Sequence, residues 1–284
     1  MAANATMRGA AGAVLVAVTA ACGSAHVRVT GDKTSEHLGV NPTTKAAVVG
    51  RCPNTGGTRP YTSLAIPGTV QLPDSVTLPA GASVYGTDMP DLAGSHAYYV
   101  IGPAGKTCAA YTGSSLGSGI DVEPQGSGRG VHVVYRAGGQ TNVADFACPY
   151  IPQVIPAGGL STCPMTPAPG QVTASVPVHT PNTYVTVVRI PPGVSKLGVA
   201  WTNTPEAERA ASVFPTVAVF AAHITSDQGE RMVYAPEISC TLPRAQASTC
   251  SAALNYFLAQ LATKEQMAPA ELAETVHAVD QFIA

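Results

Sequence analysis

Cysteines distributed along most of the chain are the feature that most constrains its fold. Six of the seven cysteines lie beyond the N-terminal segment, at Cys52, Cys108, Cys148, Cys163, Cys240 and Cys250. Close Cys-x-x-Cys pairs, which zinc sites favour, do not occur among them. An even number of cysteines in an exported chain predicts a disulfide framework. If the protein is exported, we therefore expect three disulfides rather than buried thiols or zinc ligands.

The N-terminal segment predicts export. Arg8 supplies a positive charge, an uncharged apolar run extends from Ala10 to Ala21, and Cys22 follows it directly. About a dozen apolar residues are too few for a bilayer span, which needs roughly 20, but they are typical of a secretory signal peptide. The ending Ala-Ala-Cys resembles a bacterial lipobox, whose cysteine receives a diacylglyceryl group. We expect a lipoprotein signal peptide over residues 1–21 and lipidation at Cys22, the alternative being an ordinary cleaved signal.

Composition predicts a mostly β protein that does not bind nucleic acid. The 28 glycines and 24 prolines make turns frequent and disfavour long helices through much of the chain. The formal net charge is −2, whereas binding to phosphates requires a basic patch. Beyond the signal, no uncharged apolar run approaches the length of a membrane span.

The rest of the chain divides into three ranges. Residues 22–50 are polar and without periodicity, which predicts a flexible tether. Residues 51–152 alternate short β-rich runs with Gly/Pro turns and predict a β-rich domain or subdomain; residues 153–284 predict a second β-rich part with C-terminal helices. We expect strands at Thr69–Leu72, Ala97–Ile101, Gly119–Glu123, Val131–Arg136, Gln171–Val178, Thr183–Ile190, Lys196–Trp201, Val213–His223 and Arg231–Ala235.

Helix signals occur in the second half of the chain. Thr204-Pro205-Glu206 combines an N-cap residue, a proline at the first helical position and an early acid, and predicts a short helix to about Ser212. Apolar residues from Cys250 to Leu261, and again from Leu272 to Ile283, fall on one helical face. We expect both faces to pack in the core rather than bind a partner. The predicted fold is mainly β, sandwich-like and disulfide-braced, with a C-terminal α-helical segment.

The spacing of the cysteines suggests how they pair. Cys240 and Cys250 are the closest pair and flank a loop that contains Pro243, so we expect them to bond to each other. The other four cysteines allow three connectivities. Of these we favour Cys108–Cys148 with Cys52–Cys163, because Cys108 and Cys148 lie in β-rich stretches of one expected sheet.

Three segments together resemble a group of uncharacterised secreted proteins and lipoproteins of actinobacteria. They are YYVIGPAGKTCAAYTG, DFACPYIP and CTLPRAQASTCSAALNYFLA, and the resemblance extends over about residues 98–260. The matching motifs are Gly102–Cys108, Ala147-Cys148-Pro149, and Cys240–Pro243 followed by Cys250 and Leu254-Asn255, with Lys106 in place of an aromatic residue. The resemblance implies no particular activity. It implies that the cysteines are a structural framework.

One short motif raises the question of catalysis. Gly113-Ser114-Ser115-Leu116-Gly117 matches the Gly-x-Ser-x-Gly pattern of many esterases, and Asp145 and His223 follow in the order of a triad. A nucleophile elbow requires a strand before the serine and a helix directly after it. Two glycines, a β-like run and Pro124 follow Ser115 instead. We interpret the motif as a Gly/Ser turn, and keep a secreted serine hydrolase that uses Ser115 as the alternative function.

Acidic pairs give weaker signals. Asp121 and Glu123 share one face of an expected strand, where a solvated surface is a simpler interpretation than paired glycosidase carboxylates. Asp88 and Asp91 could contribute to a calcium site, but without a repeat or an EF-hand pattern they indicate an Asx-type turn.

Histidines and aromatic residues do not define a site either. The spacing of His96, His132, His179 and His223 matches no metal-binding motif such as His-Glu-x-x-His. We expect Tyr98, Tyr99 and Trp201 to be core or strand-face residues rather than platforms for sugars. The sequence assigns no catalytic residue, metal or cofactor.

These observations predict an extracytoplasmic lipoprotein anchored to the cell membrane through Cys22. The preferred class is a non-catalytic envelope component that binds a ligand or a protein partner, or is structural. A binding protein of this kind is expected to have a sizeable apolar pocket or exposed patch.

Overall fold

The computed structural model describes residues 45–54, 66–91, 94–112, 117–123, 129–138, 140–194, 213–227 and 230–283. Residues 42–284 cluster as one compact unit, and it is this unit that is described below. Within the described ranges, no helix is long and apolar enough to cross a membrane.

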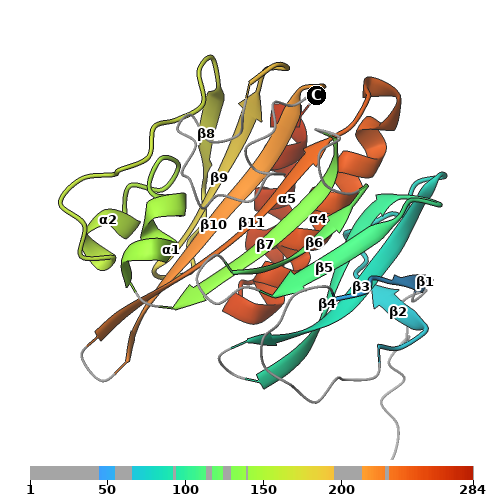
Figure 1. Ribbon diagram of the computed structural model, residues 1–284, viewed down its shortest axis with the longest axis horizontal. Coiled ribbons are helices and arrows are strands. Elements are labelled where there is room, and N and C mark those ends of the chain that lie inside the picture. Colours follow the sequence, from blue (N-terminus) through green and yellow to red (C-terminus); the bar gives the residue numbers. More distant parts are fainter. Residues whose placement is uncertain are drawn as a thin grey trace, which may run out of the picture. The chain divides into compact units, whose positions relative to one another are not determined.

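A seven-stranded antiparallel sheet, here the large sheet, is the centre of the unit (Figure 1). It takes strands from both expected β-rich parts, so 51–152 and 153–284 are two halves of one structure rather than separate domains. The strands are, in sheet order, β5 (Cys108–Thr112), β6 (Ser118–Val122), β7 (Gly130–Gly138), β11 (Glu230–Thr241), β10 (Thr216–Asp227), β9 (Thr183–Ile190) and β8 (Val172–Val176).

Four further strands form the small sheet. Its order is β2 (Thr69–Leu72), β1 (Lys45–Arg51), β3 (Ala82–Asp91) and β4 (Gly94–Pro103). β1 and β3 run parallel, and the other neighbours are antiparallel. β1 lies largely within the range 22–50, so the end of the expected tether is a strand instead. This strand pairs with β2 on one side and with β3 on the other.

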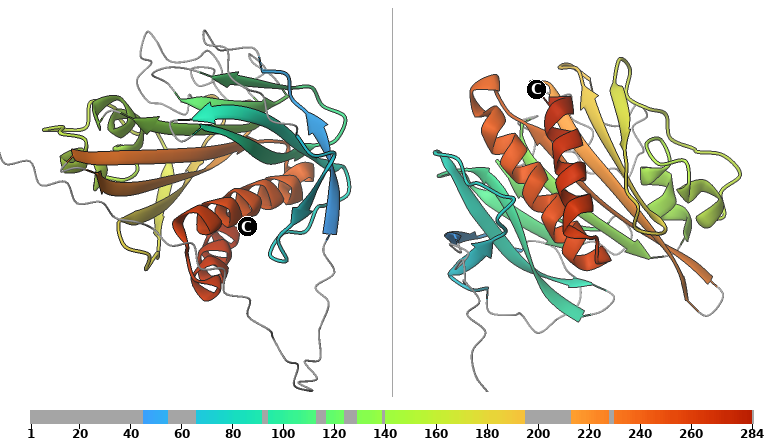
Figure 2. Two further views of the ribbon diagram at one scale, coloured as in Figure 1. Left: turned by 90° about the horizontal axis from the view of Figure 1, so that it is seen from below. Right: turned by 180° about the vertical axis from the view of Figure 1, so that it is seen from behind.

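Both faces of the large sheet are buried, as the nearly continuous apolar sequence of β10 requires. Val217, Val219 and Ala221 belong to the core on one face, whereas Ala218 and Phe220 belong to the core on the other. The first face, here the α4 face, packs against α4 (Ala247–Glu265), α5 (Pro269–Ile283) and the small sheet; the α1 face packs against α1 (Gln140–Ala147) and α2 (Val154–Ala157). Figure 2 shows α4 and α5 together on one face of the large sheet.

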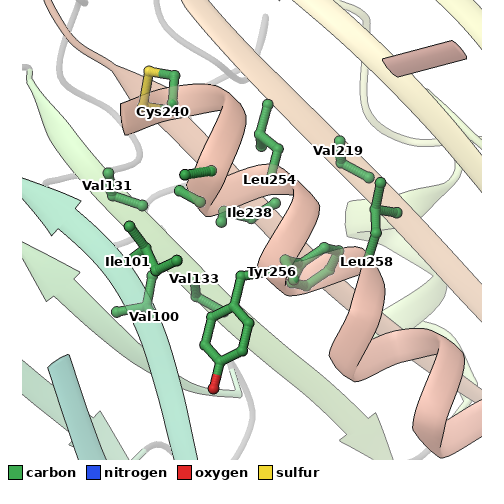
Figure 3. Close-up of a cluster of buried hydrophobic side chains, with 14 of the residues drawn as sticks. Val100, Ile101, Val131, Val133, Val219, Ile238, Cys240, Leu254, Tyr256 and Leu258 are labelled. Carbon is green, nitrogen blue, oxygen red and sulfur yellow. A yellow bond between two sulfur atoms is a disulfide. The ribbon is translucent and has the colours of Figure 1, made fainter. Parts of the chain in front are cut away.

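Helix α4 provides much of the core on its face of the sheet. Leu254 and Leu258 are fully buried and lie close to Val219 and Ile238 of the large sheet (Figure 3). α4 follows a short 3-10 turn, η1 (Arg244–Gln246), and ends where Gln266 adopts a left-handed conformation (φ 55°). The expectation that both C-terminal helices pack in the core is confirmed.

Two of the three disulfides join different layers, and the third, Cys148–Cys163, lies within the layer on the α1 face. Cys240 bonds to Cys250, as expected, and joins the end of β11 to the start of α4. The favoured pairs Cys108–Cys148 and Cys52–Cys163 are wrong, since the structure pairs Cys52 with Cys108 and Cys148 with Cys163. Cys108 packs with the core of the α4 face and Cys148 with that of the α1 face, so the large sheet separates them.

The predicted fold class is confirmed: the protein is mostly β, with two sheets, three disulfides and C-terminal helices. Most expected strands coincide with observed ones, but β1, β3, β5 and helix α1 had no clear signal. The strand expected at Lys196–Trp201 and the helix expected to end near Ser212 lie outside the described residues.

Candidate functional site

A pocket of about 530 Å³ opens on the α4 face, where the C-terminal half of α4 passes over strands of both sheets. Its volume lies within the range of small-molecule sites, roughly 300–1,000 Å³. The described lining residues are Ala97 and Tyr98 from β4, Tyr135 from β7, Tyr234 and Pro236 from β11, and Phe257, Gln260, Leu261, Thr263 and Lys264 from α4.

The pocket lies where aromatic side chains replace aliphatic ones along the strands. On the α4 face, β7 presents Val131 and Val133 to the core and then Tyr135 to the pocket. β11 changes in the same way, from Ile238 to Tyr234. Side chains two residues apart lie on the same face of a strand. The change from aliphatic to aromatic side chains can therefore be followed along the sequence of each strand.

Ring contacts organise the pocket wall. The ring centroids of Tyr98 and Tyr135 are 4.4 Å apart, with the planes inclined at 45°, so the two sheets meet through an aromatic pair. Lys264 Nζ lies 3.4 Å from the centroid of the Tyr234 ring, a cation–π contact between α4 and β11. Gln260 Nε2 donates to the carbonyl oxygen of Tyr99 at 3.0 Å and joins α4 to β4.

One polar atom at the pocket is buried without a partner. The Tyr135 hydroxyl makes no hydrogen bond within the part of the chain that the structure describes. Burial, and secondly the nearby Tyr256, raise the pKa of Tyr135 well above its usual range, so the phenol stays protonated and can donate. A buried polar group without a partner is unfavourable by about 1–3 kcal/mol, which a polar ligand atom could recover.

One charged side chain lines the described part of the pocket. Lys264 carries the only formal charge among the lining residues that the structure describes. The next residue, Glu265, contacts β10 instead: its Oε2 lies 2.9 Å from His223 Nδ1, and this nitrogen lies 2.9 Å from Thr183 Oγ1. The Glu265 carboxylate is thus directed to β10, while Lys264 adjoins the pocket.

A second polar cluster lies on the α1 face. Asp121, His132 and Ser239 occupy paired positions on β6, β7 and β11, and the Asp121 carboxylate contacts His132 Nδ1. These residue types occur in serine hydrolases, and the strand register that groups them had no sequence signal. Ser239 is only 7% exposed and Asp121 4%, however. Burial of this depth is typical of a polar network that holds strands together.

An ion pair adjoins this cluster. The Arg136 guanidinium contacts the Glu237 carboxylate, and both side chains are almost completely buried. Arg136 also lies 4.3 Å from the centroid of the Phe146 ring of α1. The ion pair therefore joins β7 to β11, and the contact between Arg136 and Phe146 joins α1 to the sheet.

The residues considered for a serine hydrolase site do not lie together in the described part of the structure. Ser115 lies outside the described residues, but Thr112 pairs with Ser118, so antiparallel strands flank the motif on both sides where an elbow would need a helix. Asp145 belongs to α1, on the α1 face, where burial raises its pKa. His223 contacts Glu265 of α4 on the opposite face, so the two candidate triad partners lie on different sides of the large sheet.

The acidic pairs differ from expectation. Asp121 is buried beside His132 rather than solvated, because the α1 face is covered. Glu123 does lie near the surface, where it contacts Lys106 at 2.5 Å and Arg129 at 3.5 Å. Asp88 is buried within strand β3, so the expected Asx-type turn is wrong at that residue. The side chain of Asp91 is not described.

The remaining candidates are divided among the core, the pocket and the undescribed residues. Tyr98 lies at the pocket and Tyr99 packs against the core, whereas Cys22 and Trp201 lie outside the described ranges. No group of three metal-binding side chains occurs in the portion of the chain described. No protein-family model, curated protein or solved structure matches this chain.

Proposed function

We propose that the chain is a non-catalytic, lipid-anchored binding protein of the cell envelope, which takes up a small, largely apolar molecule between α4 and strands β4, β7 and β11. The observation that carries this proposal is the pocket of about 530 Å³ with its walls of tyrosine, phenylalanine and leucine. Pockets that combine apolar walls with a few polar groups are typical of small-molecule sites.

Two features support the envelope location. The three disulfides of the structure are compatible with an oxidising, extracytoplasmic compartment. The apolar N-terminal run that ends at Cys22 supports attachment to the membrane through a lipid. An anchored binding protein needs no catalytic group, and the polar cluster on the α1 face is structural in this interpretation.

Displacement of a neutral fluorescent probe tests the proposal. N-phenyl-1-naphthylamine is apolar and uncharged, and its emission rises when it enters an apolar site. We expect saturable binding to the protein without its N-terminal anchor, and competition by medium-chain alcohols such as dodecanol.

A variant that narrows the pocket provides the decisive comparison. Thr263 lines the pocket, yet its side chain is exposed and donates to the Ala259 carbonyl of its own helix, so Thr263→Phe is compatible with folding. The added ring should displace about 40 Å² of apolar contact between the probe and the pocket wall. This loss corresponds to about 1 kcal/mol, or about fivefold weaker probe binding. Ala273→Phe introduces the same ring at an exposed position of α5 that does not line the pocket, and is the matched control. Equal binding by both variants would contradict the proposal.

A further inference from the structure

We infer that the ligand of this pocket carries one uncharged carbonyl group on its apolar chain, and that the carbonyl oxygen accepts a hydrogen bond from the Tyr135 hydroxyl. The inference rests on the proposed function and adds the chemical class of the ligand. Three observations carry it: the apolar wall, a hydroxyl of that wall that makes no hydrogen bond, and the partners that two other polar side chains of the wall already have.

The wall determines the larger part of the ligand. Ala97, Pro236, Phe257 and Leu261 offer no side-chain hydrogen bond. A sugar or a nucleotide would leave most of its polar groups unpaired against such a surface, which is unfavourable. An alkyl chain has no polar group to pair, so it is complementary to this surface.

Two polar side chains of the wall are already bonded within the protein. Gln260 Nε2 lies 3.0 Å from the carbonyl oxygen of Tyr99 and 3.5 Å from that of Tyr256, and donates to both. Thr263 Oγ1 donates to the Ala259 carbonyl oxygen at 3.0 Å. A ligand that used these donors would first have to break their existing hydrogen bonds, so they do not select a polar group in the ligand.

The Tyr135 hydroxyl differs from these groups, because it makes no hydrogen bond to any described residue. Burial, and secondly the nearby Tyr256, raise the pKa of this phenol, so the proton stays in place and can be donated. A plain hydrocarbon in the pocket would leave the hydroxyl unpaired, which is unfavourable. A carbonyl oxygen accepts the hydrogen bond.

A carbonyl group matches this single donor more closely than an alcohol or a carboxylate does. The hydroxyl of an alcohol brings a donor of its own, which then needs an acceptor. A carboxylate presents about four acceptor sites to the one phenol. A carbonyl oxygen brings no donor and no charge, so one hydrogen bond is sufficient to pair it.

The geometry allows the hydroxyl to reach a ligand. The Tyr135 side chain lines the pocket and is partly exposed, whereas its hydroxyl is covered by protein atoms. The pocket, with about 530 Å³ of space, has room for the ring to turn toward a ligand. This movement breaks no hydrogen bond of the phenol, and it alters the contact with the Tyr98 ring, whose centroid lies 4.4 Å away.

Two ligands of the same shape test the inference. 2-Nonanone carries a carbonyl group, and 2-methyl-1-nonene has a methylene group in place of the carbonyl oxygen. Both are titrated below their solubility limits against the folded protein loaded with the neutral probe. The measured quantity is the ratio of the two dissociation constants, because comparison of this ratio between variants cancels the different cost of taking each ligand out of water.

Two variants are compared with the original chain. Tyr135→Phe keeps the ring and removes a hydroxyl that has no partner in the described fold, so the variant is expected to fold. It should weaken binding of 2-nonanone relative to 2-methyl-1-nonene by about two- to tenfold, the change that corresponds to one neutral hydrogen bond. Tyr234→Phe removes a hydroxyl from another lining ring, keeps the ring that contacts Lys264, and is the matched control with an unchanged ratio.

The infrared stretching band of the bound carbonyl gives a second readout. A carbonyl that accepts a hydrogen bond absorbs at a lower frequency than one that does not. The band of bound 2-nonanone should therefore lie lower in the original chain and in Tyr234→Phe than in Tyr135→Phe. A purely structural role of the tyrosine would not move this band.

Each outcome has a distinct meaning. A weaker preference for 2-nonanone together with a shifted band in Tyr135→Phe alone supports the inference. An unchanged ratio in that variant, with both ligands bound, overturns the inference and leaves the proposed function intact. Tighter binding of nonanoate than of 2-nonanone to the original chain at pH 8 also overturns it, because the preferred ligand would then be an acid. Failure of both ligands and of the probe to bind overturns the proposed function as well.

Discussion

The disulfide between Cys52 and Cys108 joins the end of β1 in the small sheet to the first residue of β5 in the large sheet. It closes the longest of the three disulfide loops, with a sequence separation of 56 against 15 for Cys148–Cys163 and 10 for Cys240–Cys250. In the chain-entropy model, longer loops restrict the unfolded chain more. Removal of Cys52–Cys108 should therefore destabilise the protein most.

The expected magnitudes follow from these separations. Loop closure contributes about 4.2 kcal/mol for the Cys52–Cys108 loop, about 3.0 for Cys148–Cys163 and about 2.7 for Cys240–Cys250. Burial of the sulfur atoms predicts a different order, because Cys240 and Cys250 are together the most buried pair, at 0% and 6% exposure. If the cavity left by the removed sulfur atoms contributed more to the loss of stability than loop closure does, the variant without Cys240–Cys250 would be the least stable.

Urea unfolding of three double-alanine variants distinguishes the two accounts. Each variant replaces one disulfide, and the free energy of unfolding is obtained from the midpoint and the slope. We expect the Cys52→Ala/Cys108→Ala variant to lose about 1 kcal/mol more than either of the others, with similar slopes in all three. A greater loss in Cys240→Ala/Cys250→Ala would refute the entropic reasoning, and a smaller slope in the first variant alone would indicate separate unfolding of the small sheet.

Three further predictions concern single residues. Cys22→Ala should move the protein from the detergent phase to the aqueous or unprocessed fraction, because stable anchoring requires the acyl chains of a lipidated cysteine. Unchanged partitioning would contradict lipidation. Tyr135→Phe should raise the free energy of unfolding by about 1 kcal/mol, since it removes a buried hydroxyl without a described partner, and a loss of stability would show that the hydroxyl is bonded. Burial tends to raise the pKa of Glu271, but hydrogen bonds from Thr180 and His179 outweigh it and lower the pKa. Glu271→Gln should thus cost about 1–2 kcal/mol at pH 7. In thermal unfolding the difference should begin to shrink as the pH falls below the ordinary pKa of glutamate and should vanish only below the lowered pKa of Glu271; a pH-independent difference would exclude this carboxylate effect.

The elements that were predicted correctly have a local cause. The strands at Val131–Arg136 and Thr183–Ile190 appear as β7 and β9, because alternation of side chains is visible within a few residues. The two C-terminal helices follow from an equally local period. Cys240 and Cys250 pair as expected because only a short turn separates their elements.

Elements that depend on distant partners were missed or misassigned. β1 follows a polar range and becomes a strand by pairing with β2 and β3, which lie outside the few residues over which a periodic pattern can be recognised. Cys52–Cys108 was not predicted because the order of strands in the sheets decides which cysteines meet. Composition and periodicity carry no information on that order.

The candidate site belongs wholly to the tertiary structure. By itself, the sequence determined a mostly β chain with a disulfide framework and two C-terminal helices, because these depend on composition and on periods of two or 3.6 residues. It did not determine that Tyr98, Tyr135 and Tyr234 would meet beside Lys264, since they come from three strands and a helix spread over more than half of the chain. Only the packing of α4 across both sheets brings these side chains together, because contacts between distant segments are decided by how complete layers fit against one another.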